Sequence, residues 1–244
     1  MLKSPAISIV NAKLRYQDHT LFDHLNFHLA AGQTTCLLGA SGIGKSRFLQ
    51  LIAGLNPISA SAHITASDQK SLSGRLAYMP QTDTLLPWLN ILNNTLLGYR
   101  LRCSKKPYAR AHELLAQLGL SNALKKYPGQ LSGGMQQRVA LARVLLEDRP
   151  IVLMDEPFSA LDTITRYQLQ ELTANLLKNR TVLLVTHDPL EALRLGHHIA
   201  IMSGHPAKIE YLKYKLSDLP PRTLDNPHLL TWQSKLLHRL QALQ

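Results

Sequence analysis

The stretch of sequence that decides the fold is Gly39-Ala40-Ser41-Gly42-Ile43-Gly44-Lys45-Ser46. It matches the pattern of a phosphate-binding loop at every fixed position, and it lies between an apolar run and a segment that favours a helix. Glycines allow successive backbone N–H groups to surround phosphates. Lys45 is expected to reach the β- and γ-phosphates, and the Ser46 hydroxyl is expected to hold Mg²⁺. A tight glycine turn without a ligand explains much less of this motif, so the stretch predicts a site for a nucleoside triphosphate.

The regions on either side of this loop have the pattern of an α/β protein. Thr34–Leu38 is a short apolar run typical of a buried strand, and Arg47–Ala53 has a helical pattern that Gly54 and Pro57 end. Further strands are expected at Ile7–Val10, Leu25–Leu29, Leu76–Met79, Ile151–Met154 and Thr181–Val185, and helices at Ala109–Leu118, Val139–Leu146 and Thr163–Leu177. The predicted fold is a mostly parallel sheet flanked by helices, with an antiparallel β layer near the N-terminus.

The helical pattern between the early and late strands indicates an insertion. We expect a single domain over residues 1–244 that contains an inserted α-helical subdomain at residues 84–140. The tail at residues 220–244 begins with Pro220-Pro221 and ends in a short amphipathic helix. Such a helix is a packing element or, alternatively, a surface that binds a partner.

Three of the expected strands are followed by side chains that can carry chemistry. Asp155 ends one strand and would bind Mg²⁺, directly or through water, while Glu156 would polarise a water for in-line attack on the γ-phosphorus. His187 follows a second strand and would contact the γ-phosphate, because ligands gather at the carboxyl ends of parallel strands. Gln81 follows a third strand, where its amide can ligate Mg²⁺ or orient water. Helix capping by the two acids and an ordinary surface position for His187 are the alternatives.

A second glycine-rich element, Leu131-Ser132-Gly133-Gly134-Met135-Gln136-Gln137-Arg138, begins another helix. Ser132 offers a hydroxyl, and Gly133 and Gly134 have no side chain to keep a ligand away. The start of the helix would direct free N–H groups and a positive dipole toward an anion. One nucleotide does not need two such sites from the same chain, so we expect this element to close over ATP held by a second copy.

The composition is that of a folded, basic protein. The chain of 244 residues is 45% hydrophobic and 18% charged, with a formal net charge of +11. This charge suits nucleic acid, anionic lipid or a polyanionic ligand such as ATP. Cys36 and Cys103 have no metal-binding or redox spacing. The sequence shows neither a signal-peptide pattern nor an apolar run long enough to span a bilayer, so a cytoplasmic location is expected.

Taken together, these motifs resemble those of the ATP-binding subunit of an ABC transporter, over about Ile9 to Met202. By that resemblance Gly39–Ser46 is the Walker A loop, Gln81 is the Q-loop and Leu131–Arg138 is the signature. Asp155 and Glu156 are the Walker B pair, and His187 is the switch histidine. Ser159-Ala160-Leu161-Asp162 is the D-loop, with Asp162 among the nucleotide-binding residues. Tyr16 falls where the family has an aromatic ring that stacks on adenine, although it could equally be an ordinary strand residue. The polar stretch from Pro57 to Arg75 departs from the family pattern and leaves the local sheet geometry open.

The resemblance implies a head-to-tail homodimer that binds two ATP with Mg²⁺, closes on ATP and opens after hydrolysis through Glu156 and His187. It also implies a permease partner, which would hold the chain peripherally at the cytoplasmic face of the inner membrane. Leu85, Leu86 and Trp88 would form an apolar groove for a helix of that permease, or else they are ordinary core of the helical subdomain.

The stretch Leu85–Trp88 resembles the importer subfamily for nitrate, sulfonate and taurine, with its relatives for thiamine pyrimidine precursors. This implies import of a small polar metabolite that a solute-binding protein delivers. One alternative is a soluble ABC ATPase acting on nucleic acid or ribosomes, which the charge of +11 favours. Such proteins usually carry long coiled coils or two ATPase domains, so no nucleic-acid partner is expected. A binding module without turnover is a further alternative, and the presence of Glu156 argues against it.

Overall fold

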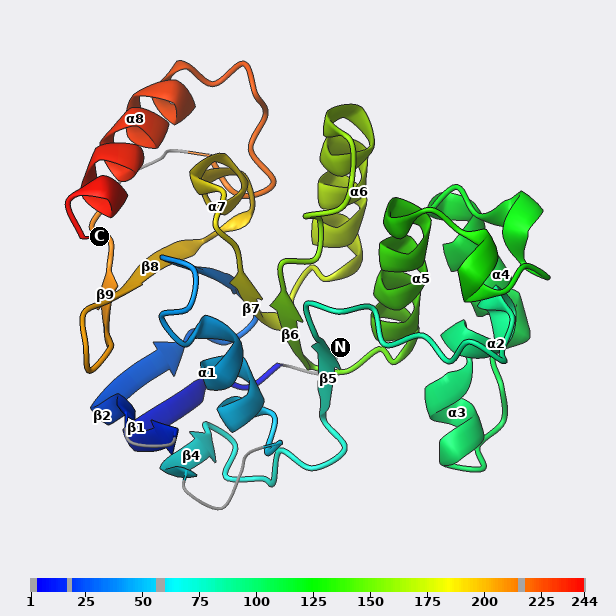
Figure 1. Ribbon diagram of the computed structural model, residues 1–244, viewed down its shortest axis with the longest axis horizontal. Helices are drawn as coiled ribbons and strands as arrows, with labels where there is room; N and C mark the ends of the chain where they lie inside the picture. Colours follow the sequence, from blue (N-terminus) through cyan, green and yellow to red (C-terminus); the bar gives the residue numbers. More distant parts are fainter. Residues whose placement is uncertain (1–3, 17–18, 56–59, 215–217, 244) are drawn as a thin grey trace.

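The computed structural model describes residues 4–16, 19–55, 60–214 and 218–243. Figure 1 shows a central sheet, with a small second sheet on one side and a group of helices on the other. Two features expected from the sequence lie outside the described residues: Pro57 as a helix stop, and the last residue of the tail, Gln244.

The central sheet has six strands in the order β5-β6-β7-β3-β8-β9. Strands β5, β6, β7, β3 and β8 are parallel, and β9 pairs with β8 in the antiparallel sense. The strands are β3 (Thr34–Gly39), β5 (Leu76–Met79), β6 (Ile151–Asp155), β7 (Thr181–Val185), β8 (His198–Ser203) and β9 (Lys208–Tyr211). The predicted α/β class with a mostly parallel sheet is confirmed, whereas the sequence pattern does not predict β8 and β9.

The central strands bury side chains on both faces of the sheet. In β6, Ile151 and Leu153 belong to the core beneath helix α1 (Lys45–Ile52) and the small sheet, while Val152 and Met154 belong to the core beneath the other helices. A strand covered on both faces has no polar side for solvent, so its sequence is a continuous apolar run. The uninterrupted apolar sequence of β6 therefore places it in the middle of the molecule.

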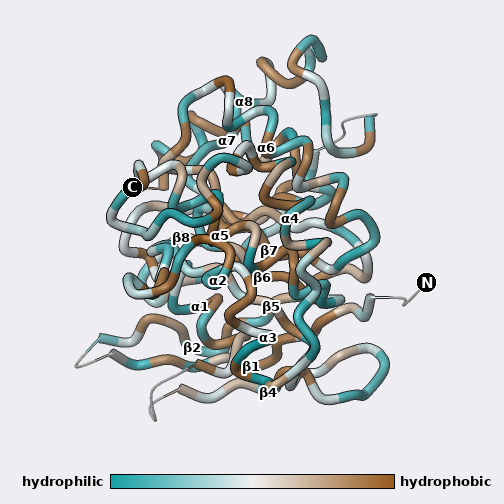
Figure 2. The backbone as a smooth tube through the Cα atoms, turned by 90° about the vertical axis from the view of Figure 1, so that its right-hand side faces the viewer, coloured by the Kyte–Doolittle hydropathy of each residue, from teal (hydrophilic) through white to brown (hydrophobic). Residues whose placement is uncertain are grey.

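The small sheet is antiparallel, in the order β2-β1-β4, and confirms the predicted antiparallel layer. Its strands are β1 (Ile7–Tyr16), β2 (His19–Leu29) and β4 (Ala60–Ala66), and Figure 2 shows them together at the opposite end of the molecule from α8. Strand β4 lies in the polar stretch whose geometry the sequence left open. It pairs with β1 because Ile64 and small alanines alternate toward the core while Ser61, His63 and Thr65 are exposed.

A group of helices follows β5. It consists of α2 (Ile91–Thr95), α3 (Leu97–Leu101), α4 (Tyr108–Gln117), the 3₁₀ helices η1 (Ser121–Ala123) and η2 (Pro128–Gln130), and α5 (Gly133–Leu146). Helix α5 packs against α2, α4 and β5, so it joins the helical group to the sheet. The boundary expected at residue 140 falls inside α5, and the division of the chain into subdomains stays a prediction.

The remaining helices cover the sheet next to β7 and β8. They are α6 (Thr163–Leu176), α7 (Pro189–Leu195) and α8 (Pro227–Gln241). Helix α8 packs against α7 and buries Leu229 and Leu236, so this part of the tail is a packing element. Within the described residues, no helix is both long and apolar enough to cross a membrane.

Candidate functional site

Most of the predicted site residues come together at one edge of the central sheet. Strands β3, β5, β6 and β7 are parallel, so their carboxyl ends meet at the same edge. The phosphate-binding loop follows β3, and Asp155 is the last residue of β6. Gln81 and His187 each follow a strand within two residues. Loop, carboxylates, amide and imidazole therefore lie around one position where a ligand can bind.

The backbone of the phosphate-binding loop requires its glycines. A Cβ at Gly39 would lie 2.6 Å from the carbonyl oxygen of Met202, so only glycine fits against β8. Gly44 has φ 108° at the start of α1, a conformation that L side chains rarely adopt. Ser41 and Gly42 are exposed at the mouth of the loop, whereas the Ile43 side chain is buried in the core. Ile43 is thus placed to offer a ligand its backbone rather than its side chain.

The side chain of Lys45 is held inside the loop. Its Nζ donates hydrogen bonds of 2.8 Å to the carbonyl oxygens of Gly39 and Ala40. Burial lowers the pKa of Lys45, and the charges of Glu156 and Asp155 oppose that shift. The amine therefore lies between the loop backbone and two carboxylates, which is where a phosphate chain would need a cation.

Asp155 and Ser46, the two residues expected to hold Mg²⁺, interact with each other through their side chains. Burial raises the pKa of Asp155, and a hydrogen bond from the Ser46 side chain opposes that rise. No group of three or more His, Cys, Asp or Glu side chains in the described part of the chain can hold a metal by itself. Mg²⁺ commonly uses one or two protein oxygens and completes its shell with water and phosphate oxygens. Ser46 and Asp155 fit a metal ion that arrives with a nucleotide.

Glu156 and His187 form a pair at the ends of neighbouring strands. Oε1 of Glu156 lies 3.2 Å from Nδ1 of His187, whose side chain is 61% exposed. Glu156 has φ 50°, which is uncommon for a residue with a side chain, and its N–H donates to the carbonyl oxygen of Val185 at 2.9 Å. After this bend the carboxylate lies beside the imidazole of His187.

Gln137 belongs to the site, but its contacts there were not predicted from the sequence. It is buried in α5, and its Nε2 donates to the carbonyl oxygen of Glu156 at 3.0 Å and to Oγ of Ser159 at 3.2 Å. Its Oε1 accepts a 3.0 Å hydrogen bond from the N–H of Ala160. The amide thus joins the helix of the signature to the loop after β6. The sequence shows only that Gln137 lies in the signature, and this position does not predict which atoms its side chain binds.

The N-terminus of α5 is open to solvent. Ser132 is the N-cap residue, and its Oγ accepts a hydrogen bond from the N–H of Met135 at 3.3 Å. A Cβ at Gly133 would meet nothing within 4 Å, whereas at Gly134 it would lie 3.0 Å from the carbonyl oxygen of Ala160. Figure 1 shows α1 and α5 apart, with β5 and β6 between them. The helix of the signature and the helix that follows the phosphate-binding loop therefore lie apart within one chain.

The contacts of three other predicted site residues, Asp162, Gln81 and Tyr16, show no interaction specific to a nucleotide site within the described part of the chain. Asp162 is the N-cap residue of α6, where its Oδ1 accepts a hydrogen bond from the N–H of Thr165 at 3.0 Å. Gln81 is exposed and makes no hydrogen bond to another described residue. Tyr16 is the last residue of β1, and its side chain lies outside the described part of the structure. The roles of these three residues in binding or catalysis stay predictions.

The apolar stretch after Gln81 lies partly in the helical group. Leu85 packs against the core, whereas Trp88 is 70% exposed. The buried Asn94 side chain fixes this loop by hydrogen bonds with the backbone of Leu86 and Leu89. A separate open groove of about 610 Å³ lies between β5 and the helical group, lined mainly by apolar side chains that include Tyr78, Leu97, Leu101 and Val144.

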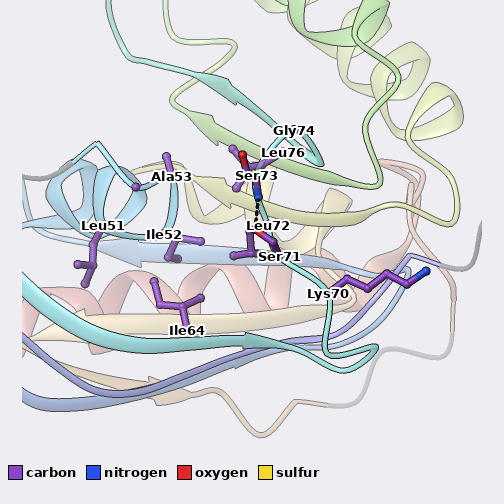
Figure 3. Close-up of a pocket in the computed structure, with 11 residues that line it drawn as sticks. Leu51, Ile52, Ala53, Ile64, Lys70, Ser71, Leu72, Ser73, Gly74 and Leu76 are labelled. Carbon is purple, nitrogen blue, oxygen red and sulfur yellow. Dashed lines mark hydrogen bonds between the residues drawn. The ribbon is translucent and has the colours of Figure 1, made fainter.

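A further pocket, of about 580 Å³, lies at the C-terminal end of α1. Figure 3 shows Leu51, Ile52 and Ile64 along it, with the Lys70 side chain extending away. Lys45 and the phosphate-binding loop are at the opposite end of α1, so this pocket does not belong to the site at the sheet edge.

The fold and the sheet-edge cluster define a P-loop nucleoside triphosphatase with a second, outward-facing glycine element. A sequence profile of the family described as ABC transporter matches residues 22–159. The chain belongs to this family and is one of its ATPases.

Relatives of nearly the same length are similar along the whole chain. An uncharacterized ABC transporter ATP-binding protein of Haemophilus influenzae is 41% identical, covering 96% of this chain and 98% of its own. An aliphatic sulfonates import ATP-binding protein of Rhodococcus jostii is 38% identical, covering 97% and 96%. Among solved structures, a dimeric, post-hydrolysis ATP-binding cassette bound to ADP and Pi has a TM-score of 0.74 and 27% identity, covering 86% of this chain and all of the other.

Proposed function

We propose that two copies of this chain bind two ATP molecules between them, head to tail, and power an importer by closing on ATP and opening after hydrolysis. The observation that carries the proposal is the separation of α5, whose N-cap is Ser132, from α1, which follows the phosphate-binding loop, within one copy. An open helix N-terminus with free N–H groups is a site for an anion, and the second copy supplies that anion as bound ATP. The similar dimeric cassette bound to ADP and Pi supports this arrangement.

Within each site, Lys45 and the N–H groups of the loop bind the β- and γ-phosphates. Ser46 and Asp155 hold Mg²⁺, which neutralises charge on the phosphates, and Gln81 moves in as a further ligand or orients the attacking water. Tyr16 stacks on the adenine ring.

Glu156 polarises the water for attack on the γ-phosphorus, and His187 holds the Glu156 carboxylate and contacts the γ-phosphate. Ser132, Gly133 and Gly134 of the other copy complete the site, with Asp162 close to this interface. The helical region at residues 84–140 moves as a subdomain of the single domain that residues 1–244 form.

The groove between β5 and the helical group is the place where a helix of a membrane permease binds. Its lining is largely apolar, as a groove that receives an amphipathic helix needs. It also contains Thr84, three residues after Gln81, so the groove is continuous with the loop that reaches the nucleotide. Leu85, Leu86 and Trp88 are not among the residues that line it, so this docking site differs from the predicted Leu85–Trp88 patch. Binding there holds the chain at the cytoplasmic face of the inner membrane.

The solute is a small polar metabolite that a solute-binding protein delivers. The relative from Rhodococcus jostii is named for import of aliphatic sulfonates, which favours a sulfonate or taurine over nitrate and over a thiamine pyrimidine precursor. Uptake of labelled taurine and of a labelled pyrimidine precursor by cells with and without this chain separates the two groups. Loss of pyrimidine uptake alone would contradict the preference for a sulfonate.

Substitution of Ser132 tests the shared site. Ser132→Arg places a bulky side chain where the second copy binds, and Ser73→Arg makes the same change at an exposed position between β4 and β5. Both variants are combined with Glu156→Gln, which slows hydrolysis and holds the ATP-bound dimer. We expect ATP-dependent dimers in size-exclusion chromatography for Ser73→Arg and monomers for Ser132→Arg, with ATP affinity of the monomer unchanged.

Two results would contradict the proposal. Dimerisation of Ser132→Arg with ATP would exclude the signature as half of the site. A strong loss of ATP affinity in the Ser132→Arg monomer would show that one chain uses both glycine elements for a single nucleotide. Stimulation of hydrolysis by DNA or ribosomes, without a membrane partner, would favour the alternative of a soluble ATPase.

A further inference from the structure

A small cavity lies beside the Glu156–His187 pair. It has a volume of about 40 Å³, and Arg166, Thr186 and Glu191 line it together with that pair. Such a volume holds a water molecule if two or more polar groups face it. The cavity therefore connects the site at the sheet edge with side chains of α6 and α7 that the proposed chemistry does not use.

Glu191 is a buried carboxyl group of α7, with only 5% of its surface exposed. Its Oε2 accepts a hydrogen bond from Nε2 of Gln170 at 3.1 Å. Its Oε1 has no hydrogen bond of acceptable geometry within the described residues, and the same is true of the buried Nε of Arg166. Unpaired buried polar atoms are costly, and both belong to residues that line the cavity. A water in the cavity would lie beside polar side chains of both residues.

A chain of hydrogen bonds holds Glu191 in place from the other side. Oε1 of Gln170 accepts from Nη1 of Arg194, and Nε of Arg194 donates to the carbonyl oxygen of Arg222 at 3.1 Å. Nη1 of Arg222 donates in turn to the carbonyl oxygen of Gly196 at 2.8 Å, at the end of α7. The buried carboxyl is therefore fixed between the catalytic edge and the segment that leads to α8.

The surroundings keep this carboxyl group uncharged near neutral pH. Burial and the charge of Asp188 raise the pKa of Glu191 to about 8, although Thr186, Gln170 and Arg166 favour the ionised form. On β3, burial raises the pKa of the Cys36 thiol, and the charge of Glu191 adds to this rise. Arg194 lies on the same helix, and Glu156 and His187 lie across the cavity. A protonated carboxyl can donate a hydrogen bond to water, which a carboxylate cannot.

We propose that Glu191 is a positioning residue for ATP hydrolysis, which holds the Glu156–His187 pair in place through a water in the shared cavity. This inference rests on the roles proposed above for Glu156 and His187. The protonated form is the active one. An ionised Glu191 would add a negative charge beside Glu156 and disfavour the approach of the anionic γ-phosphate.

Three variants of the full chain test the inference. Glu191→Leu removes the polar group, Glu191→Gln imitates the protonated carboxyl, and Glu113→Gln makes the same change at an exposed position of α4 as a control. At pH 7 we expect Glu191→Leu to lower kcat by about tenfold or more, since misplaced catalytic groups cost rate, with KM for ATP unchanged within about twofold. Glu191→Gln should recover most of this loss, and Glu113→Gln should match the native chain.

The pH profile separates positioning from a merely structural role. Between pH 7 and 9, kcat of the native chain and of Glu113→Gln should fall with a midpoint near the pKa of Glu191, about 8. Glu191→Gln cannot ionise and should not show this fall. If Glu191→Leu does not fold, the comparison of these profiles decides alone.

Two outcomes overturn the inference: a kcat of Glu191→Leu equal to that of the native chain, or identical pH profiles for the native chain and Glu191→Gln. Glu156→Gln separates these outcomes from a failure of the proposed function. If Glu156→Gln hydrolyses ATP at the native rate, the catalytic roles themselves are wrong. If Glu156→Gln is inactive while Glu191→Leu is fully active, only the positioning role is wrong.

Discussion

Replacement of Gln137 by leucine should damage hydrolysis more than it damages the fold. The two side chains are similar in size, so the buried position in α5 stays filled. The change removes three hydrogen bonds: from Nε2 to the carbonyl oxygen of Glu156, from Nε2 to Oγ of Ser159, and from the N–H of Ala160 to Oε1. What is lost is the link between the signature helix and the loop that carries Glu156.

The remaining contacts limit the loss of stability. A net intramolecular hydrogen bond contributes about 1 kcal/mol, so three give an upper estimate of about 3 kcal/mol. The carbonyl oxygen of Glu156 still accepts from the N–H of Ser159 at 3.3 Å and from its Oγ at 3.1 Å, and Ala160 is exposed enough for water to bind its N–H. We therefore expect the free energy of unfolding to fall by about 1 to 2 kcal/mol, since few polar groups stay unpaired.

Urea unfolding and steady-state ATPase kinetics measure the two effects separately. We expect kcat to fall about tenfold because the backbone of Glu156 is less well placed, and KM for ATP to stay within about twofold. Gln117→Leu, at an exposed position of α4, is the control and should change neither quantity. A Gln137→Leu chain with native kcat would show that the link does not position Glu156. A rise in KM with native kcat would show that Gln137 acts on ATP binding instead.

Three further predictions follow from the same structure. Lys45→Ala should weaken ATP binding about tenfold to a hundredfold, because hydrogen bonds to a charged group contribute about 1.5–3 kcal/mol. Fluorescence titration with a labelled ATP measures the change, and an unchanged affinity would exclude Lys45 from the phosphate site. Leu101 is 75% exposed and lines the groove beside β5. Leu101→Asp should abolish assembly with the permease, measured by co-purification from membranes, while the ATPase activity of the isolated chain persists. Normal assembly would show that the permease does not bind in this groove. Burial raises the pKa of Glu191 from 4.5 to about 8. The contribution of protonated Glu191 to the free energy of unfolding is therefore complete below pH 4.5 and is lost as the pH rises through about 8. The stability of the native chain relative to Glu191→Gln should thus fall by about 1 kcal/mol per pH unit between pH 6 and 8 in chemical denaturation, and a constant difference would contradict the burial of an ionisable group there.

The sequence predicts those parts of the molecule where a residue type is tied to one local geometry. The phosphate-binding loop is such a case, because glycines with unusual φ angles and a lysine at a fixed spacing serve one purpose. Strands β6 and β7 were predictable because burial on both faces leaves continuous apolar runs. Strand β4 was not, since its inward side chains are mostly alanines, and its stability comes from pairing with β1.

The contacts that organise the site are of another kind, because they join residues far apart in the chain. Gln137 bonds to the backbone 19 residues later, and Glu191 bonds to Gln170, 21 residues earlier. No local pattern marks such pairs, because a glutamine in a helix has the same propensity whether or not its amide finds a partner. The placement of Glu156 and His187 at the same sheet edge could be predicted, but the distance of 3.2 Å between Oε1 of Glu156 and Nδ1 of His187 could not.

The backbone of Glu156 shows why these long-range contacts matter for a shared site. A left-handed conformation at a residue with a side chain costs about 1–2 kcal/mol and persists only when the surroundings impose it. Here β7 binds its N–H, Gln137 binds its carbonyl oxygen, and His187 lies beside its carboxylate. In the proposed dimer, the N-terminus of α5 contacts the ATP of the partner, while Gln137 on the same helix holds the Glu156 that faces the chain's own ATP. In that dimer one helix would therefore join the two nucleotides, and ATP at one site would help to place Glu156 at the other.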